Sequence, residues 1–128
     1  MTFLGFLAVG VGAAVGAWLR WGLGILLNPV FPTLPLGTFA ANMLGGYLMG
    51  IALGLFSALQ ALSPEVRLLI ATGFLGGLTT FSTFSAEATT LLARQQFGWA
   101  VLHIAAHVAG SIALTFAGIA TMRLLLRN

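Results

Sequence analysis

Long apolar stretches fill almost the whole of this sequence, and they restrict its fold more than any other feature. Only five basic and two acidic residues interrupt them in 128 positions, whereas charged residues make up about a quarter of an ordinary globular chain. The mean hydropathy is +1.07, and a helix that crosses a bilayer takes about 20 apolar residues. The sequence therefore predicts an all-α membrane protein with four transmembrane helices in a single domain, residues 1–128.

Prolines and polar residues divide the chain into four expected spans. Three prolines between positions 29 and 35 end the first helix. Ser63, Pro64 and Glu65 supply an N-cap, a proline at the first helical position and an acid in the first turn, which together indicate a helix start. The expected spans are residues 2–27, 37–59, 65–94 and 99–126.

The arginines hardly favour either orientation of such a bundle. With four spans both termini lie on one side, together with Arg67, Arg123 and Arg127, while Arg20 and Arg94 lie on the other. Because the positive-inside rule acts through an excess of basic residues, this small difference leaves both a single orientation and dual insertion open. The arginines form no basic patch, so no nucleic acid is expected as a partner.

Glycines recur at helical spacing in the first two spans. Gly46, Gly50 and Gly54 lie four residues apart, as do Gly12 and Gly16, and this spacing lets helix backbones approach closely. It indicates tight helix packing and is weaker grounds for a dimer. Four helices nevertheless fill their own interior, so a transport path would need a second copy of the chain.

The third span carries the densest polar signal. Between Gly73 and Ser85, glycines and hydroxyl residues interrupt what would otherwise be helix in the middle of the membrane. Unwound backbone at that depth occurs only where it is buried in protein or lines a cavity, often around a bound cation. We therefore expect the third helix to be broken here and not merely kinked.

Two phenylalanines follow these glycines. Phe81 and Phe84 are three residues apart and share a helical face, with Ser82 and Thr83 on the adjacent face. The edge of a phenyl ring is the positive end of its quadrupole, so these rings, the hydroxyls and the amide of Asn42 in the second span suit an anion. The alternatives are plain packing of the rings and an interhelical hydrogen bond from the amide.

The remaining polar groups lie late in the chain. Glu87 is the one carboxylate near the membrane interior, as either a proton site or a hydrogen-bonded vestibule residue. His103, His107, Ser111 and Thr115 follow one another at intervals of four and form a stripe that must face protein or water. Two histidines alone leave a zinc site incomplete, so we interpret them as hydrogen-bonded polar positions.

Together these motifs resemble the Fluc family of fluoride channels, also called CrcB proteins. The resemblance covers the whole chain and is carried by Gly-Gly-Leu-Thr-Thr-Phe-Ser-Thr-Phe-Ser at 76–85, Gly-Thr-Phe-Ala-Ala-Asn at 37–42 and Arg20. It implies an antiparallel dual-topology homodimer in the plasma or inner membrane, surrounded by lipid. Such a dimer would carry fluoride passively out of the cytoplasm through two pores and would not be an enzyme.

The resemblance also implies roles for individual residues. Backbone carbonyls of Gly76 and Thr79 from both subunits would hold one structural sodium ion that is not transported. Gly76 would lie in unwound backbone, where glycine adopts dihedral angles that valine cannot. Arg20 would lie in a vestibule, and Glu87 and His107 would lie in the vestibule or along a polar track. The fluoride path would use these residues: Thr38, Asn42, Phe81, Ser82, Thr83, Phe84 and Ser111.

The histidines depart from the small or hydroxyl residues that this resemblance leads us to expect in the fourth span. His103 and His107 would narrow the pore, tune it with pH or face a neighbouring helix. Two other functions also stay open. A small proton-coupled cation exporter would need an acid in its first span, which has none, and a non-transporting assembly subunit would use its glycines only to pack against larger partners.

Overall fold

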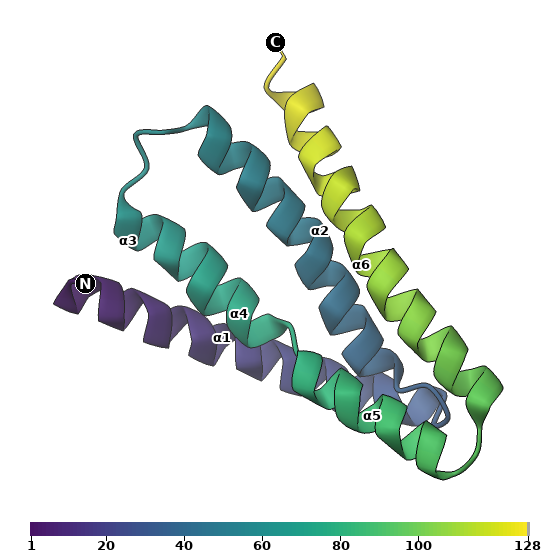
Figure 1. Ribbon diagram of the computed structural model, residues 1–128. Helices are drawn as coiled ribbons and strands as arrows, with labels where there is room; N and C mark the ends of the chain where they lie inside the picture. Colours follow the sequence, from purple (N-terminus) through teal and green to yellow (C-terminus); the bar gives the residue numbers. More distant parts are fainter. Residues whose placement is uncertain (128) are drawn as a thin grey trace.

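The computed structural model describes residues 1–127, and its long helices run in alternating directions (Figure 1). The first two spans and the turn between them are α1 (Phe3–Leu27), η1 (Asn28–Val30) and α2 (Leu36–Ala58). The third span is divided into α3 (Pro64–Arg67), the wider π-type turns of η2 (Leu68–Leu75), α4 (Gly76–Leu78) and α5 (Phe81–Ala93). The last helix is α6 (Phe97–Leu125).

Four of these stretches are long and apolar enough to cross a membrane: Phe3–Val30, Leu36–Ala58, Pro64–Ala93 and Phe97–Leu125. Their bounds differ by a few residues from the spans expected from the sequence, and the fourth begins at Phe97 and not at Trp99. The chain is therefore an all-helical, multi-pass membrane protein, and many large apolar side chains point outward from its helices.

Local hydrogen bonds explain where the second and third spans begin. Ser63 Oγ accepts from the amide three residues further on, with Pro64 in the first turn of α3, as the sequence predicted. Asn28 Oδ1 accepts from the amides of Gly37 (2.8 Å) and Thr38 (3.2 Å). The end of the first span thus caps α2, so the proline-rich connection is held close to both helices.

The glycine stripes bring helices into backbone contact inside the subunit. A methyl group added to Gly50 would overlap the carbonyl oxygen of Thr115 in α6, and one added to Gly16 would overlap the carbonyl oxygen of Phe74 in η2. The predicted tight packing is confirmed, but these contacts join α2 to α6 and α1 to the third span of the same chain. A dimer would have to use another face.

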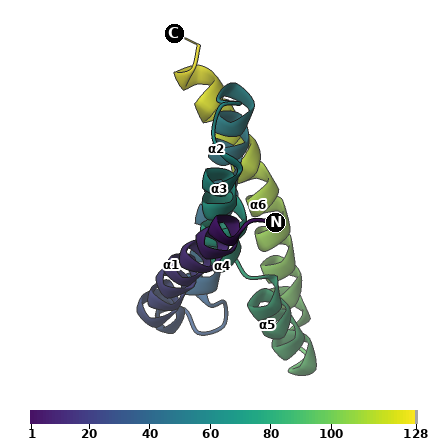
Figure 2. The same cartoon turned by 90° about the vertical axis from the view of Figure 1, so that its left-hand side faces the viewer.

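The third span changes its packing partner part-way along. Its first half, from α3 to α4, packs on α1, whereas α5 packs on α6, and Figure 2 shows α5 diverging from α1. Between the halves, Thr79 (φ −89°, ψ 156°) and Thr80 (φ −150°, ψ 112°) have extended backbone. Thr80 Oγ1 then caps α5 by accepting from the Thr83 amide at 3.1 Å. This change of direction places the residues of α5 against α6.

Gly76 does not have the unwound backbone that was expected. Its φ of −63° and ψ of −37° are those of an ordinary right-handed helix, and the nearest atom to an added methyl group is the Ala71 carbonyl oxygen at 3.8 Å. The prediction that glycine is needed here for its dihedral freedom is therefore wrong. The extended residues are two threonines, whose branched side chains suit that backbone.

Candidate functional site

Asn42 on α2 holds the extended segment in place. Its Nδ2 donates to the Thr80 carbonyl at 3.1 Å, and its Oδ1 accepts from the Thr80 amide at 2.8 Å, which is the pair of bonds that a neighbouring β-strand makes. Asn42 Nδ2 also lies 3.2 Å from Nδ1 of His107. The sequence required a polar partner for Asn42, and the structure identifies it as the backbone of the third span.

Thr80 lies at the centre of a small group of hydroxyls and is not among the site residues expected from the sequence. Its Oγ1 donates to Thr83 Oγ1 at 3.1 Å and lies 3.2 Å from Ser82 Oγ. Thr80 itself is buried, whereas Ser82 is exposed. A threonine just before a helix that restarts is a typical N-cap, and this signal would have pointed to it.

Two backbone carbonyls lose their usual helical partners at this segment. In a continuous helix the Thr80 amide would bond to the Gly76 carbonyl, and the Thr83 amide would bond to the Thr79 carbonyl. Here the first amide donates to Asn42 and the second to the Thr80 hydroxyl. The carbonyls of Gly76 and Thr79 are thereby released from these two bonds.

An open groove of about 430 Å³ runs past the extended segment. The rings of Phe81 and Phe84 lie in its wall with centroids 5.4 Å apart and planes tilted by 59°. Phe81 is 76% exposed, whereas Phe84 is 7% exposed. The groove is lined by these predicted site residues, among others: Asn42, Gly76, Thr79, Phe81, Phe84, His107 and Ser111.

A second cavity, of about 280 Å³, adjoins the hydroxyls of Thr80 and Thr83. Arg20 lines it together with Thr38, Thr80 and Thr83. The guanidinium Nε donates to the Gly77 carbonyl at 3.0 Å, which holds the charge at the end of α4. Because Thr80 lines both spaces, the hydroxyls lie between the cavity at Arg20 and the groove of the phenylalanine rings.

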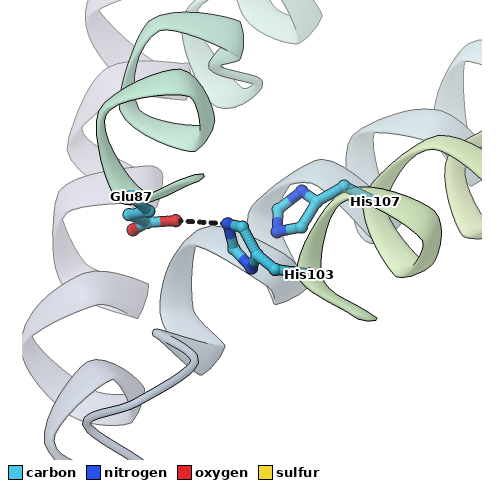
Figure 3. A group of neighbouring side chains, drawn as sticks. All are labelled: Glu87, His103 and His107. Atoms are coloured by element: carbon cyan, nitrogen blue, oxygen red, sulfur yellow. Dashed lines mark ion pairs between the residues drawn. The ribbon is translucent and has the colours of Figure 1, made fainter. Parts of the chain in front are cut away.

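Glu87 on α5 and two histidines on α6 form a cluster between these helices (Figure 3). Glu87 Oε2 accepts from the Thr38 hydroxyl at 2.7 Å, and its Oε1 lies 3.3 Å from Nε2 of His103. His103 and His107 are 2% and 4% exposed, and their ring centroids lie 5.3 Å and 4.7 Å from that of Phe84. The polar stripe of the fourth span thus faces protein here, and both histidines face a neighbouring helix.

Comparison with known proteins identifies the family of the chain. A model of the family described as "CrcB-like protein, Camphor Resistance (CrcB)" matches residues 7–119. The chain belongs to the CrcB family. Three relatives of this CrcB chain carry the name fluoride-specific ion channel FluC. The relative from Aromatoleum aromaticum is 62% identical over 115 residues, covering 90% of this chain and 88% of its own.

The other two relatives match over even more of the chain. The protein from Cupriavidus pinatubonensis is 59% identical over 122 residues, covering 95% of this chain and 97% of its own. The protein from Ralstonia nicotianae is 55% identical over 125 residues, covering 98% and 99%. The family resemblance stated from the sequence motifs is confirmed, and the relatives are named as ion channels and not as enzymes.

Proposed function

We propose that this CrcB chain is a fluoride-selective channel through which the ion leaves the cytoplasm passively. The names of its relatives support this function. The observation that carries it in the structure is the pair of rings at Phe81 and Phe84 in one groove with Asn42 and Ser111. This groove offers ring edges and polar groups to an anion without a positive side chain that would trap it.

Fluoride is small and strongly hydrated, so the path must replace its water. The ring edges do this electrostatically. The Thr83 hydroxyl accepts its bond from Thr80 and keeps its own hydrogen to donate. Both N–H groups of Asn42 are directed at partners inside the subunit, Thr80 and His107. Asn42 therefore positions the Thr80 segment, and it donates to the ion only when the contact with His107 opens.

We further propose that the functional unit is an antiparallel homodimer with two pores. The groove is open on one side, and the ring of Phe81 projects from the subunit, so a second copy would supply the missing wall. The glycine stripes are already used within the chain, which leaves this face for the partner. The nearly balanced arginines support insertion in both orientations.

The released carbonyls of Gly76 and Thr79 fit a structural sodium ion. Both residues line the groove, and carbonyl oxygens at a helix break suit such a cation. We propose that the break lies at mid-membrane depth and that both subunits contribute these carbonyls to one shared ion. Bound there, sodium would balance the partial negative charge of the oxygens. Within the chain, Asn42 and the Thr80 hydroxyl keep the competing amides away from them.

Transport by the purified protein tests this proposal. Liposomes loaded with potassium fluoride should release fluoride when valinomycin carries the compensating potassium, with no proton gradient and no added partner. Liposomes loaded with potassium chloride are the control and should release little chloride. Export of a cation driven by a proton gradient, with no fluoride efflux, would favour the small cation exporter, and the absence of any transport by folded protein would favour the assembly subunit.

A further inference from the structure

The cluster of Glu87, His103 and His107 (Figure 3) contains buried polar atoms that the proposed fluoride path does not use. Glu87 Oε1, His103 Nε2 and His107 Nε2 are all buried and have no hydrogen-bond partner within the part of the chain that the structure describes. Glu87 Oε1 and His103 Nε2 lie 3.3 Å apart. This contact is an ion pair only when His103 is protonated. Buried polar atoms without partners are unusual in proteins and call for an explanation, which a bound ion can supply.

We infer that this cluster binds a divalent transition metal ion of the zinc type. One ligand atom from each of the three residues lies within 4.8 Å of the other two. Two histidines and one carboxylate form a common zinc donor set, which leaves a fourth position for water. Tetrahedral bonds of 2.0–2.1 Å would place ligand atoms about 3.3 Å apart, so the pair of Glu87 and His103 already has a suitable spacing.

The surroundings hold the ligands in position. The Thr38 hydroxyl donates to the second oxygen of Glu87 at 2.7 Å, and such outer hydrogen bonds orient the carboxylates that bind metals. The ring of Phe84 packs against both imidazoles. The two histidines are one helical turn apart on α6, and the acid comes from α5, so the site exists only because these helices pack together.

The position of the proton on His107 decides what must change before a metal ion can bind. Asn42 Oδ1 accepts from Thr80, so Asn42 Nδ2 is the donor toward His107 Nδ1. A neutral His107 therefore carries its proton on Nε2. Coordination through Nε2 would move this proton to Nδ1, where it would face the Asn42 amide. Metal binding thus requires the contact between Asn42 and His107 to open, which links the metal to the residue that holds the Thr80 segment.

A consequence for transport follows, and it rests on the proposed function. The ion would lie among residues that pack against Phe84, where its positive charge would attract fluoride and hold it. We therefore expect zinc to slow fluoride efflux. The metal acts here as an inhibitor and differs from the proposed sodium ion in its ligands and in its place on the subunit.

Binding can be measured without transport. Tag-free protein in detergent, titrated with Co²⁺, should develop the visible absorption of a tetrahedral complex, saturate at one ion per subunit and lose the band when Zn²⁺ is added. Glu87→Gln, His103→Gln and His107→Gln should each weaken binding by at least about tenfold. Glu65→Gln removes the carboxylate at the exposed start of α3 and should bind as the unmodified chain does.

Either of two results would overturn this inference. One is the absence of saturable Co²⁺ binding to folded protein, and the other is equal binding by the three cluster variants and Glu65→Gln. Circular dichroism and gel filtration establish that each variant is folded before it is titrated. If one variant fails to fold, the other two still decide the outcome, because each removes a different ligand.

Fluoride efflux then separates this inference from the proposed function. Slower efflux in zinc from the unmodified chain, with His103→Gln insensitive to zinc at whatever rate it conducts, would support both. Saturable Co²⁺ binding by a protein that releases no fluoride would support the metal site and contradict the channel. Efflux from a protein that binds no Co²⁺ would support the channel and contradict the metal site.

Discussion

Asn42 and Thr80 together replace the helical hydrogen bonds that the third span gives up. Extended backbone inside a membrane protein needs partners for its amide and carbonyl groups, because the lipid offers none. Asn42 satisfies both groups of Thr80, and the Thr80 hydroxyl satisfies the amide of Thr83 in the first turn of α5. One amide side chain and one hydroxyl therefore determine where the helix stops and restarts.

Asn42→Leu tests this role directly. The substitution would leave the amide and carbonyl of Thr80 without partners, at a cost of about 2–4 kcal/mol in the free energy of unfolding. Thr89→Ala, which removes an exposed hydroxyl from α5, should change it by less than about 0.5 kcal/mol. Denaturant unfolding in detergent measures both. Equal stability of the two variants would show that the pairing with Thr80 contributes little.

Phe81 and Phe84 differ in burial, and this difference separates packing from conduction. Phe81→Ile keeps an apolar side chain at an exposed position, so the stability of the subunit should hardly change. Fluoride efflux should fall by about tenfold or more, the effect of losing about 1.4 kcal/mol of stabilisation of the ion. Phe84→Ile should lose conduction similarly, and about 1 kcal/mol of stability as well because the ring packs against both histidines. Unchanged efflux in both variants would assign the rings to packing alone.

The packing of the helices depends on glycines at their contacts and on the interruption of the third span at Thr79 and Thr80. Glycines bring α2 against α6 and α1 against the third span. The extended threonines allow the third span to leave α1 and reach α6. The groove, the hydroxyls around Thr80 and the cluster of Glu87 with the histidines all lie where the third span passes from α1 to α6. The position of the interruption therefore decides which side chains meet.

Gly50→Ala should destabilise the subunit. Its added methyl group would overlap the Thr115 carbonyl oxygen, and overpacking of this kind costs about 1–3 kcal/mol. Gly22→Ala is a matched control, because within residues 1–127 no atom outside the adjoining residues and the backbone of its own helix lies within 4 Å of the added methyl group, and alanine favours helix by up to about 1 kcal/mol. Thermal unfolding in detergent compares the two. A Gly50→Ala protein as stable as Gly22→Ala would contradict the close contact between α2 and α6.

The groove of the subunit is open on one side, and its nearly balanced arginines hardly favour either orientation in the membrane. The open groove, the projecting ring of Phe81 and the released carbonyls all belong to the same region. An antiparallel second copy would cover them, and lipid would surround the remaining apolar surface. Two consequences can be tested, one for orientation and one for sodium.

Adding three lysines after residue 128 should fix the orientation of the chain. The excess of positive charge would hold both termini in the cytoplasm, and antiparallel dimers would no longer form, so efflux should be lost. Co-expression with a chain that carries lysines at positions 95 and 96 should restore it. The sequence has no cysteine, so one cysteine introduced near a terminus reports orientation by labelling from either side. Full efflux from a population in a single orientation would contradict dual topology.

Removing sodium should reduce fluoride efflux, although sodium itself would not cross the membrane. Efflux into N-methylglucamine buffer after prolonged dialysis, compared with efflux after sodium is restored, measures the effect. Thr79→Ala should be mild, because the proposed ligand is a backbone carbonyl. Gly76→Ala should leave the fold of the subunit intact, since the residue is helical and has space around it. Equal efflux with and without sodium would contradict the structural ion.

Patterns among neighbouring residues in the sequence were sufficient to predict several features of this protein. Apolar runs, the prolines at 29–35 and the start signal at Ser63 placed the spans, because helix formation and its caps depend on neighbouring residues. The motif at 76–85 identified the family and the phenylalanine pair. These inferences needed no knowledge of which helices touch.

Contacts between distant residues were decided only by the tertiary structure. The sequence showed that Asn42 needed a partner, but not that Thr80, 38 residues further along, provides it. Nothing in the spacing of the two histidines showed that Glu87 joins them, so their pairing looked incomplete as a metal site. The dihedral angles of Gly76 were also predicted wrongly. Each of these outcomes depends on where α5 turns away from α1 and meets α6, and that turn results from packing among all four spans and not from any one segment alone.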